Sequence, residues 1–413
     1  MKVFKKPSYT KLLVILFVIA QLGVIVWYAA NRSSGNQLVV AEASQKIYVA
    51  VEEDGKIAVV NSDNQAVKYI DLSQTVNGMD THYAPHNVQV APDGRTVWVT
   101  GNAAGEHQHG SSLLPRLKNF AGGLSPFKKV LAHGDEEAMP AQNESPMSAS
   151  GPVQDEVIVI DAATDKIIKR IGLGQGLHLA HVALTLDSQF AFVTAQEKDL
   201  IFKISGSTYD VEQQYSVKVS SGPHGLRVTP DSSTVYIANS TGKSLGVLDI
   251  ASGSLSYIPL EGQAVQTGVT PDGKYVVASI YDTKSLAVYS PATKKLSYVK
   301  LPAETKGPIQ MYPTPDSRYV YLADQGYYFD QPIGSNVYKI DLADLKVVTT
   351  IKSGQAPHGV VVSKDGQRTY VTNLLGGSVS IIDNSKDMEI STVKVGGQPN
   401  GISIWTKGAG GTP

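Results

Sequence analysis

A strand-and-turn motif recurs along this chain at nearly regular intervals, and this recurrence restricts the possible folds more than any other feature. One clear copy runs from Gly222 to Ser240, where apolar and polar residues alternate on both sides of a turn at Asp231. The turn aspartates of the successive copies are Asp93, Asp187, Asp231, Asp272, Asp316 and Asp365. The first interval is 94 residues, and the later ones are 41 to 49 residues. Short strands with a period in the low forties are typical of propeller blades, so we predict an all-β propeller.

The repeats account for seven blades of four strands each. Six blades follow from the turn aspartates, beginning with an inner strand at 87–91 and ending with an outer strand near Glu389. One strand is left over near the C-terminus, at 401–405, and three are left over near the N-terminus, at 46–52, 56–61 and 66–72. Together they make a seventh blade with one-plus-three closure, which removes two sheet edges. We therefore predict a seven-bladed β-propeller over residues 46–405 and a disordered tail at 406–413.

The sixth repeat resembles a known family. Tyr370 is followed by Val371-Thr372-Asn373, with Pro-His-Gly before this stretch and a strand from Ser378 to Asp383 after it. This pattern is similar to the YVTN-repeat β-propeller family, and the resemblance covers nearly all of 46–405. More distantly, the chain is similar to nitrous-oxide-reductase-type and cytochrome-d1-type propellers. The resemblance implies the fold and leaves the function open, because related propellers serve as surface-layer modules, binding scaffolds and redox domains.

The N-terminal region predicts a membrane anchor. Residues 12–30 form an apolar run broken only by Gln21, which is long enough to cross a bilayer once. Four lysines precede this run, so the positive-inside rule places residues 1–11 in the cytoplasm. Residues 31–45 form a polar linker, and the propeller then lies on the periplasmic or extracellular side. The alternative is a cleaved signal peptide, which also exports the propeller.

Composition excludes several kinds of chemistry. The chain of 413 residues contains no cysteine, which excludes disulfides, thiolate catalysis and c-type haem attachment. Its net charge of −1 argues against a nucleic-acid partner. We find neither a glycine loop that could hold a phosphate nor a Ser/His/Asp nucleophile set. The sequence therefore leaves open whether the protein is an enzyme.

The long first interval between turn aspartates indicates an insertion. It falls at 102–155, between the second and third strands of the first blade. Blade topology places this loop at the end of the channel where the inner strands begin, which we call the top. Loops of this length are usually functional or disordered. We interpret this one as a lid on the propeller rim, with a membrane-lying segment or a partner-docking surface as alternatives.

Polar residues gather where the inner strands begin. His86, His224 and His358 each stand seven residues before a turn aspartate, and Asn400 has the same register in the closing blade. In the other three blades the polar residue comes one position later, as His181, Gln266 and Gln310. A one-residue offset normally turns a side chain to the other face, unless a β-bulge restores its direction. The pattern predicts a polar ring at the top of the channel.

A ring of imidazoles on one axis suits a transition metal, since neutral imidazole binds copper, zinc and iron. Copper is the first candidate, because the segment from Asp80 to His86 resembles the histidine-rich part of nitrous-oxide-reductase-type propellers. This chain lacks their cupredoxin domain and its cysteine ligands. The candidate metal ligands are His82, His86, His181, His224 and His358, with His107, His109 and His133 of the insertion as additional candidates.

Two other interpretations of the polar ring stay open. Histidine or asparagine before the inner strand can serve the fold alone, by hydrogen bonding to the backbone of a neighbouring blade. The ring can also bind an organic ligand, together with aromatic residues of a top loop in the fifth blade. The candidate residues for such a ligand are Gln266, Gln310, Asn400, Tyr327 and Tyr328.

These observations lead to a functional expectation. We expect a membrane-anchored, extracytoplasmic propeller whose top face binds a small ligand or an envelope protein. The first alternative is a metal-dependent redox or metal-handling protein with a histidine-lined channel mouth. The second is a structural module of the cell envelope.

Overall fold

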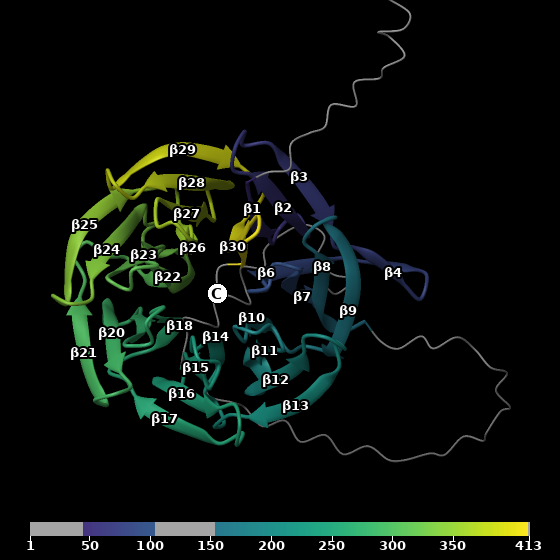
Figure 1. Ribbon diagram of the computed structural model, residues 1–413, viewed down its shortest axis with the longest axis horizontal. Helices are drawn as coiled ribbons and strands as arrows, with labels where there is room; N and C mark the ends of the chain where they lie inside the picture. The colour runs from purple at the N-terminus through teal and green to yellow at the C-terminus, as the bar shows by residue number, and fades with distance from the viewer. Residues whose placement is uncertain (1–43, 104–152, 412–413) are drawn as a thin grey trace, which may run out of the picture. The chain divides into compact units, whose positions relative to one another are not determined.

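Seven sheets surround a central axis in the computed structural model, which describes residues 44–103 and 153–411 (Figure 1). Six sheets have four strands and the seventh has five. In the described residues, the only helices are two short 3-10 turns, η1 (Gln196–Lys198) and η2 (Tyr327–Phe329). The predicted all-β, seven-bladed propeller is therefore confirmed. The predicted anchor at 12–30 lies outside the described residues, and no helix within them is long and apolar enough to cross a membrane.

Each four-stranded blade uses four consecutive antiparallel strands, in order from the axis to the rim. The first blade contains β6 (Tyr83–Val90), β7 (Thr96–Ala103), β8 (Asp155–Asp161) and β9 (Lys166–Gly174), and the second contains β10 (Leu179–Leu184), β11 (Phe190–Ala195), β12 (Leu200–Ser205) and β13 (Val211–Ser216). The third contains β14 (Pro223–Val228), β15 (Thr234–Asn239), β16 (Ser244–Asp249) and β17 (Leu255–Pro259), and the fourth contains β18 (Ala264–Val269), β19 (Val276–Ile280), β20 (Ser285–Ser290) and β21 (Lys295–Lys300). The fifth contains β22 (Pro308–Pro313), β23 (Tyr319–Asp324), β24 (Asn336–Asp341) and β25 (Lys346–Lys352), and the sixth contains β26 (Pro357–Val362), β27 (Arg368–Asn373), β28 (Ser378–Asp383) and β29 (Met388–Lys394).

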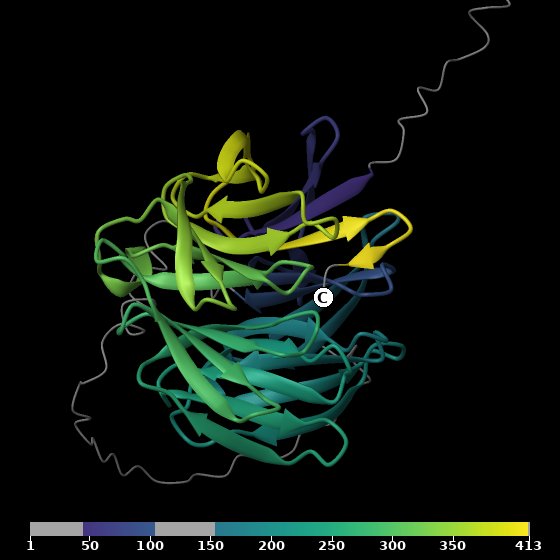
Figure 2. The same ribbon diagram turned by 60° about the vertical axis from the view of Figure 1, so that its left-hand side comes forward.

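The seventh blade combines strands from both ends of the described chain (Figure 2). Its inner strand is β30 (Pro399–Thr406), followed outward by β1 (Gln45–Val51), β2 (Lys56–Asn61) and β3 (Val67–Asp71). β30 and β1 are antiparallel, with Trp405 opposite Lys46 and Ile404 opposite Ile47. The Trp405 indole N–H also donates to the Gly94 carbonyl at 2.9 Å. This bond joins the seventh blade to the first.

The expectation of a disordered tail from residue 406 is wrong for the part that the structure describes. β30 continues to Thr406, and β31 (Gly410–Gly411) folds back to pair with it. Gly410 has φ +70°, and a Cβ at this position would meet the Pro92 carbonyl oxygen at 2.1 Å. Only glycine fits such a backbone in such a close approach. The glycine-rich end of the chain is therefore suited to packing against the Asp93 turn.

A small hairpin lies outside the blades and has no counterpart in the predicted strands. It consists of β4 (Gln74–Val76) and β5 (Met79–Thr81), and it connects the seventh blade to the first. The Gln74 amide nitrogen donates to the Tyr83 hydroxyl at 2.7 Å and to the Glu156 carboxylate at 2.8 Å. These bonds attach the hairpin to the first blade.

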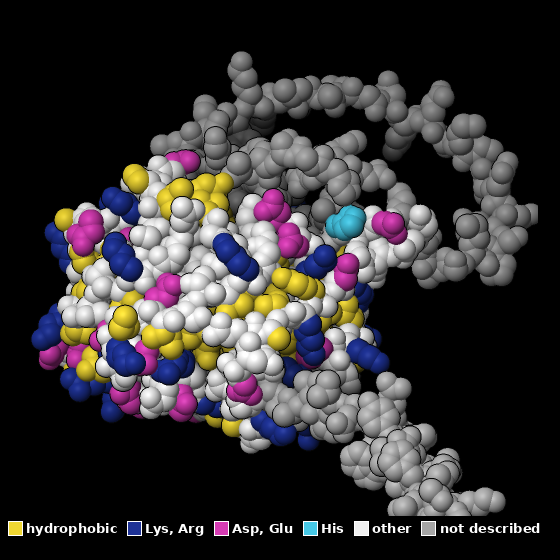
Figure 3. Space-filling model, turned by 90° about the horizontal axis from the view of Figure 1, so that it is seen from above, with side chains coloured by type: hydrophobic (Ala, Val, Ile, Leu, Met, Phe, Trp, Pro, Cys, Tyr) yellow, Lys and Arg dark blue, Asp and Glu magenta, His cyan; other side chains and the backbone are white. Residues whose placement is uncertain are grey.

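The core lies between neighbouring blades, and the rim is exposed to solvent. Large side chains such as Trp98, Tyr48 and Phe192 are fully buried, whereas the outermost strands have mostly exposed or half-buried residues. On the face of the molecule shown in Figure 3, acidic and basic side chains are interspersed rather than gathered by sign. This mixture agrees with the near-zero net charge of the whole chain.

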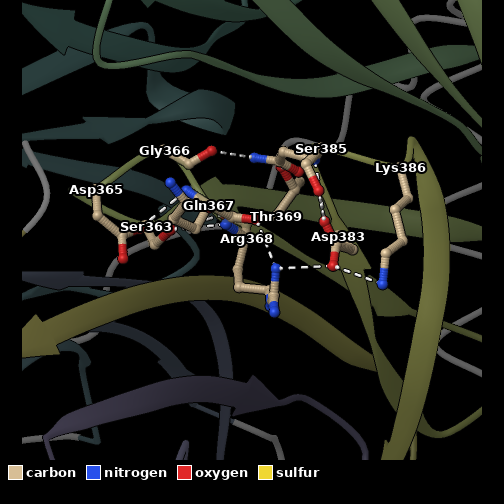
Figure 4. A network of polar contacts seen from close by, with 10 residues as sticks. Ser363, Asp365, Gly366, Gln367, Arg368, Thr369, Asp383, Ser385 and Lys386 are labelled. Atoms are coloured by element: carbon tan, nitrogen blue, oxygen red, sulfur yellow. Dashed lines mark hydrogen bonds and ion pairs between the residues drawn. The ribbon is translucent and has the colours of Figure 1, made fainter.

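The turn aspartates close the hairpin between the first and second strands of each of the first six blades. In the sixth blade, the Asp365 carboxylate accepts hydrogen bonds from the Ser363 hydroxyl at 2.6 Å and the Gln367 N–H at 2.9 Å (Figure 4). The same hydroxyl-to-aspartate contact joins Thr229 to Asp231 at 2.6 Å and Thr270 to Asp272 at 2.7 Å. Aspartate favours turns because it can bond to the backbone just after it. This chemistry explains the recurring motif.

A β-bulge occurs where each of the seven inner strands begins. In the second blade, Leu179 pairs with Ala195 and Val182 pairs with Val193, so Ala180 and His181 share one partner, Thr194. The Thr194 hydroxyl accepts from the His181 N–H at 3.0 Å and donates to the His224 carbonyl of the next blade at 2.7 Å. Thr100, Ser279 and Thr372 make the same pair of bonds in the first, fourth and sixth blades. This hydroxyl relay connects the bulge to the neighbouring blade in four of the seven blades.

We expect Thr194→Val to destabilise the protein by about 1–3 kcal/mol, because it leaves the His181 N–H and the His224 carbonyl buried without their partner. Urea unfolding measures this change. Thr293→Val is the matched control, since Thr293 lies in an exposed turn. Equal unfolding free energies for the two variants, within about 0.5 kcal/mol, would mean that the hydroxyl relay does not stabilise the ring.

Candidate ligand-binding site

Four histidines from four blades meet at the top of the central channel. His86 begins the inner strand of the first blade, His181 that of the second, His224 that of the third and His358 that of the sixth. All four are buried, with at most 5% of each residue exposed. The ring centroids of His86 and His224 are 5.5 Å apart, and those of His181 and His224 are 4.9 Å apart.

The bulges explain how residues in two different registers reach the same place. Two residues on the bulged strand oppose one residue on its partner, so either of them can be directed to the axis. In the third blade the histidine, His224, is the first of the two bulge residues. In the second blade the histidine, His181, is the second of them. A regular strand would have separated these two side chains to opposite faces.

A small cavity lies among the histidines, with a volume of about 20 Å³ open to the centre of a water molecule. This is enough for a group about the size of one water molecule. Loops between second and third strands help to enclose it, because Gln196 of η1 and Tyr328 of η2 lie on its wall. The remaining lining residues are His86, His178, His224, Val265, Ile309 and His358.

Each of the four histidines has a defined partner at Nδ1. The His224 Nδ1 lies 2.9 Å from the Val265 carbonyl oxygen in the next blade. The Nδ1 atoms of His181 and His358 face side-chain amide nitrogens, those of Gln266 at 3.3 Å and Gln325 at 2.6 Å. The His86 Nδ1 faces the Asn400 amide nitrogen at 3.2 Å and lies 3.9 Å from the Glu52 carboxylate. These partners hold the rings in position.

The opposite ring nitrogen, Nε2, has no such partner in three of the four histidines, as far as the described residues show. Within the described residues, the Nε2 atoms of His86, His181 and His358 are buried and have no hydrogen-bond partner. The Gln310 amide nitrogen and the Tyr328 hydroxyl in this part of the propeller are also buried without a partner among these residues. Buried polar groups are nearly always paired, because an unpaired one costs about 1–3 kcal/mol. A concentration of such groups around one cavity is the mark of a binding site.

Burial keeps three of the histidines neutral. Burial, followed by the charge of His86, lowers the pKa of His224 to about 3. Burial and neighbouring imidazoles also lower the pKa values of His181 and His358 well below the usual value. Burial alone would raise the pKa of Glu52, but its contacts with His86 and Asn400 outweigh burial and lower it. The site thus combines neutral imidazoles with one ionised carboxylate.

The candidate metal ligands divide into two groups. Ring nitrogens of His86, His181 and His224 lie within 4.8 Å of one another, close enough to meet one ion. His82, in contrast, is exposed and is not part of this group, because it lies at the hairpin before the inner strand begins. The insertion histidines His107, His109 and His133 lie outside the described residues.

The candidate ligand-binding residues have different positions. Gln266 and Asn400 are fully buried and support His181 and His86. Gln310 is buried with its amide nitrogen unpaired among the described residues. Tyr328 lies on the cavity wall, with its ring 5.4 Å from that of His358, whereas Tyr327 is half-buried and does not line the cavity.

Two functional positions, Glu52 and Gln325, were missed by the sequence reasoning. Glu52 directly follows the second strand of the seventh blade, and its position beside His86 depends on the pairing of β1 with β30. Gln325 begins the loop in which only the tyrosines were predicted to bind a ligand, and its amide supports His358. His178 lies three residues before His181 and also lines the cavity. The only sequence signal for these residues was their place at the top ends of strands.

The fold and the site define a seven-bladed β-propeller with a histidine-lined pocket at one end of its axis. No known protein-family profile and no curated protein sequence matches the chain. Its fold is similar to a solved structure of Kuenenia stuttgartiensis hydrazine synthase, at a TM-score of 0.57 and 16% identity, covering 78% of this chain and 92% of the other. It is also similar to the dihydro-heme d1 dehydrogenase NirN, which was solved in complex with DHE, at a TM-score of 0.53 and 13% identity over 86% of this chain and 64% of NirN. A functionally unknown protein from Desulfotomaculum acetoxidans matches at a TM-score of 0.62 and 12% identity, over 87% of this chain and 98% of the other.

The lowered histidine pKa values predict that stability falls in mild acid. An unfolded histidine takes up a proton near pH 6.5, whereas the buried one does not, so the unfolded state binds more protons below this pH. We expect each of His181, His224 and His358 to cost about 2 kcal/mol of unfolding free energy as the pH falls from about 6.5 to about 5.

Urea unfolding across this pH range measures the loss. His224→Gln should reduce the pH dependence of the unfolding free energy by about the contribution of one histidine. His82→Gln, at an exposed position, should leave this pH dependence unchanged. A stability that does not vary between about pH 5 and about pH 7 would contradict a neutral histidine cluster.

Proposed function

We propose that this protein is a binding protein that holds a small ligand, or a small group of a larger partner, at the top of its central channel. One observation carries the proposal. Three buried Nε2 atoms, those of His86, His181 and His358, have no hydrogen-bond partner among the described residues, and two of these histidines, His86 and His358, line the cavity. A ligand that paired with them would recover the free energy that their burial costs.

We further propose that the protein belongs to the YVTN-repeat family. Tyr370 to Asn373 form the end of β27, and each polar residue of this motif has a structural role in the sixth blade. Thr372 joins the bulge to the Asn400 carbonyl, and Asn373 accepts a hydrogen bond from the Gly354 N–H at 3.0 Å. These contacts are a physical reason for the motif to recur in propellers.

The membrane-anchored, extracytoplasmic location is also part of the proposal. It is supported by the apolar run at 12–30 and the lysines before it. Gln45 lies opposite Thr406, at the other end of the channel from the Pro399–Val51 pair and the histidines.

We expect the full-length protein to sediment with membranes and to resist extraction by high salt, because the apolar run anchors it in the bilayer. In intact cells stripped of any outer barrier, added protease should degrade the propeller. A cytoplasmic protein of the same cells is the control that must survive. A propeller that remains protected until the cells are lysed would contradict the proposed location.

Ligand binding can be tested by thermal unfolding of the full-length protein with a panel of small metabolites. A ligand at 100 times its Kd should stabilise the protein by about 2.7 kcal/mol, which appears as a raised Tm. The variants Tyr328→Phe and His358→Gln should lose this rise, while His82→Gln should keep it. A ligand whose effect survives both pocket variants binds elsewhere and would contradict a site at the top of the channel.

A second candidate function is a copper or other transition-metal centre. It is favoured by the three ring nitrogens of His86, His181 and His224 that lie within 4.8 Å of one another. A bound ion in this place would support either redox chemistry or metal handling. Elemental analysis after dialysis against copper, zinc and iron decides it: one ion per chain in the parent and none in a His86→Ala/His224→Ala variant would establish the metal centre.

A further inference from the structure

The hydrogen bonds around the histidines determine which ring nitrogen carries the proton. The Gln266 side-chain oxygen accepts from the Thr267 N–H at 2.9 Å, so the other end of its amide, the NH₂ group, faces His181 Nδ1. An amide nitrogen only donates, and a neutral imidazole has one donor and one acceptor nitrogen. His181 therefore accepts at Nδ1 and carries its proton on Nε2.

The same reasoning applies to His358. The Gln325 side-chain oxygen accepts from the Tyr328 N–H at 3.2 Å, which directs the amide nitrogen to His358 Nδ1 at 2.6 Å. The proton of His358 is therefore on Nε2 as well. In both cases a backbone N–H fixes the orientation of the glutamine amide. A reversed amide would turn its NH₂ group towards that N–H, so one hydrogen bond would be lost and two donors would face each other.

His86 has an equivalent arrangement with a carboxylate in place of the backbone. The Asn400 amide nitrogen donates to the Glu52 carboxylate at 2.7 Å and lies 3.2 Å from His86 Nδ1. With a donor facing its Nδ1, His86 accepts there and has its proton on Nε2. His224 is the exception, because its Nδ1 faces a carbonyl oxygen and must carry the proton there.

The three buried Nε2 atoms without a partner in the described part of the chain are thus N–H donors. A metal ion needs a lone pair on the coordinating nitrogen, which this arrangement provides only at His224. Buried donors require an acceptor instead, and two of these three histidines, His86 and His358, line the cavity. The Gln310 amide nitrogen, also buried and unpaired among these residues, is a further donor at the top of the channel.

A cation lies on the same inner strand as His224. Arg227 is on β14, three residues after His224, and its half-buried guanidinium packs over the Tyr312 ring at 5.8 Å. Within the described residues it has no carboxylate partner, and it donates a hydrogen bond to the Leu226 carbonyl at 3.2 Å. After burial and the neighbouring imidazoles, its charge is a further cause that lowers the pKa of His181. Glu52, the carboxylate beside His86, already accepts from Asn400.

We propose that the pocket binds a small oxyanion group, either the carboxylate of an organic acid or a small inorganic oxyanion, and that His86, His181 and His358 donate to it through Nε2–H. This proposal rests on the proposed ligand-binding function and specifies its chemistry. Arg227 supplies the positive charge. The cavity of about 20 Å³ admits one or two oxygen atoms, so the remainder of a larger ligand stays outside it.

Calorimetric titration of the full-length protein with formate, nitrite and formamide tests the proposal. Formamide is the size of formate without its charge. We expect at least one of the two anions to bind about tenfold more tightly than formamide, because hydrogen bonds to a charged acceptor are stronger. Arg227→Gln should weaken anion binding about tenfold, Arg227→Lys should retain most of it, and Arg95→Gln, at an exposed turn, should leave it unchanged.

Nitrogen-15 NMR of histidine-labelled protein gives a readout independent of affinity. His86, His181 and His358 should show the Nε2–H tautomer, and their Nε2–H signals should shift when the anion that binds is added. Formamide binding as tightly as formate, or no anion binding by a folded parent protein, would overturn the oxyanion proposal.

The outcomes also separate this proposal from the one on which it rests. A stoichiometric copper ion bound through Nε2, with no anion binding, would overturn the oxyanion proposal and leave a ligand-binding pocket in place. The metabolite panel tests that pocket separately, through the loss of stabilisation in Tyr328→Phe and His358→Gln. If neither an anion nor any metabolite of the panel binds at the pocket, the histidines are structural residues of the inner strands.

Discussion

The bulge at the start of each inner strand is the constraint on which the rest of this propeller depends. Inner strands from seven blades crowd around one axis, and a regular strand would send alternate side chains into the blade interfaces. The bulge frees one residue in each blade to face the channel. In four blades, the hydroxyl of Thr194 or its equivalent then satisfies the backbone that the bulge disrupts, and links that blade to the next. Stability and the polar pocket therefore come from the same local irregularity.

The pocket combines features that a purely structural ring does not need. Structural pairing accounts for the Nδ1 side of the histidines, which bond to Val265, Gln266, Gln325 and Asn400. It does not account for the Nε2 side, where three nitrogens are buried without partners among the described residues. Unpaired buried groups persist where function requires them, because selection otherwise removes their cost. The division between a satisfied and an unsatisfied side of each ring is the strongest argument for a ligand.

Much of the fold could be predicted from the sequence, and less of the site. The period of the turn aspartates and the alternation of apolar residues predicted the all-β propeller and its seven blades. The offset of His181, Gln266 and Gln310 was visible, but its outcome depended on bulges that leave no mark in the residue pattern. His82 and His86 are close in sequence, yet one is exposed and the other buried. Glu52 and Gln325 escaped notice because nothing local to them indicates their histidine partners.

The sequence by itself determined the elements that depend on near neighbours along the chain. Turn chemistry acts over a few residues, and side-chain alternation acts within one strand, so blade number and the start of each inner strand were encoded locally. The tertiary structure decided which side chains share the axis, which ring nitrogens are paired and which carry protons. Those properties require the ring to bring distant segments together, such as Asn400 and Glu52, which are 348 residues apart. Burial then gives these contacts their energetic weight, because unpaired polar groups are costly only where water cannot reach them.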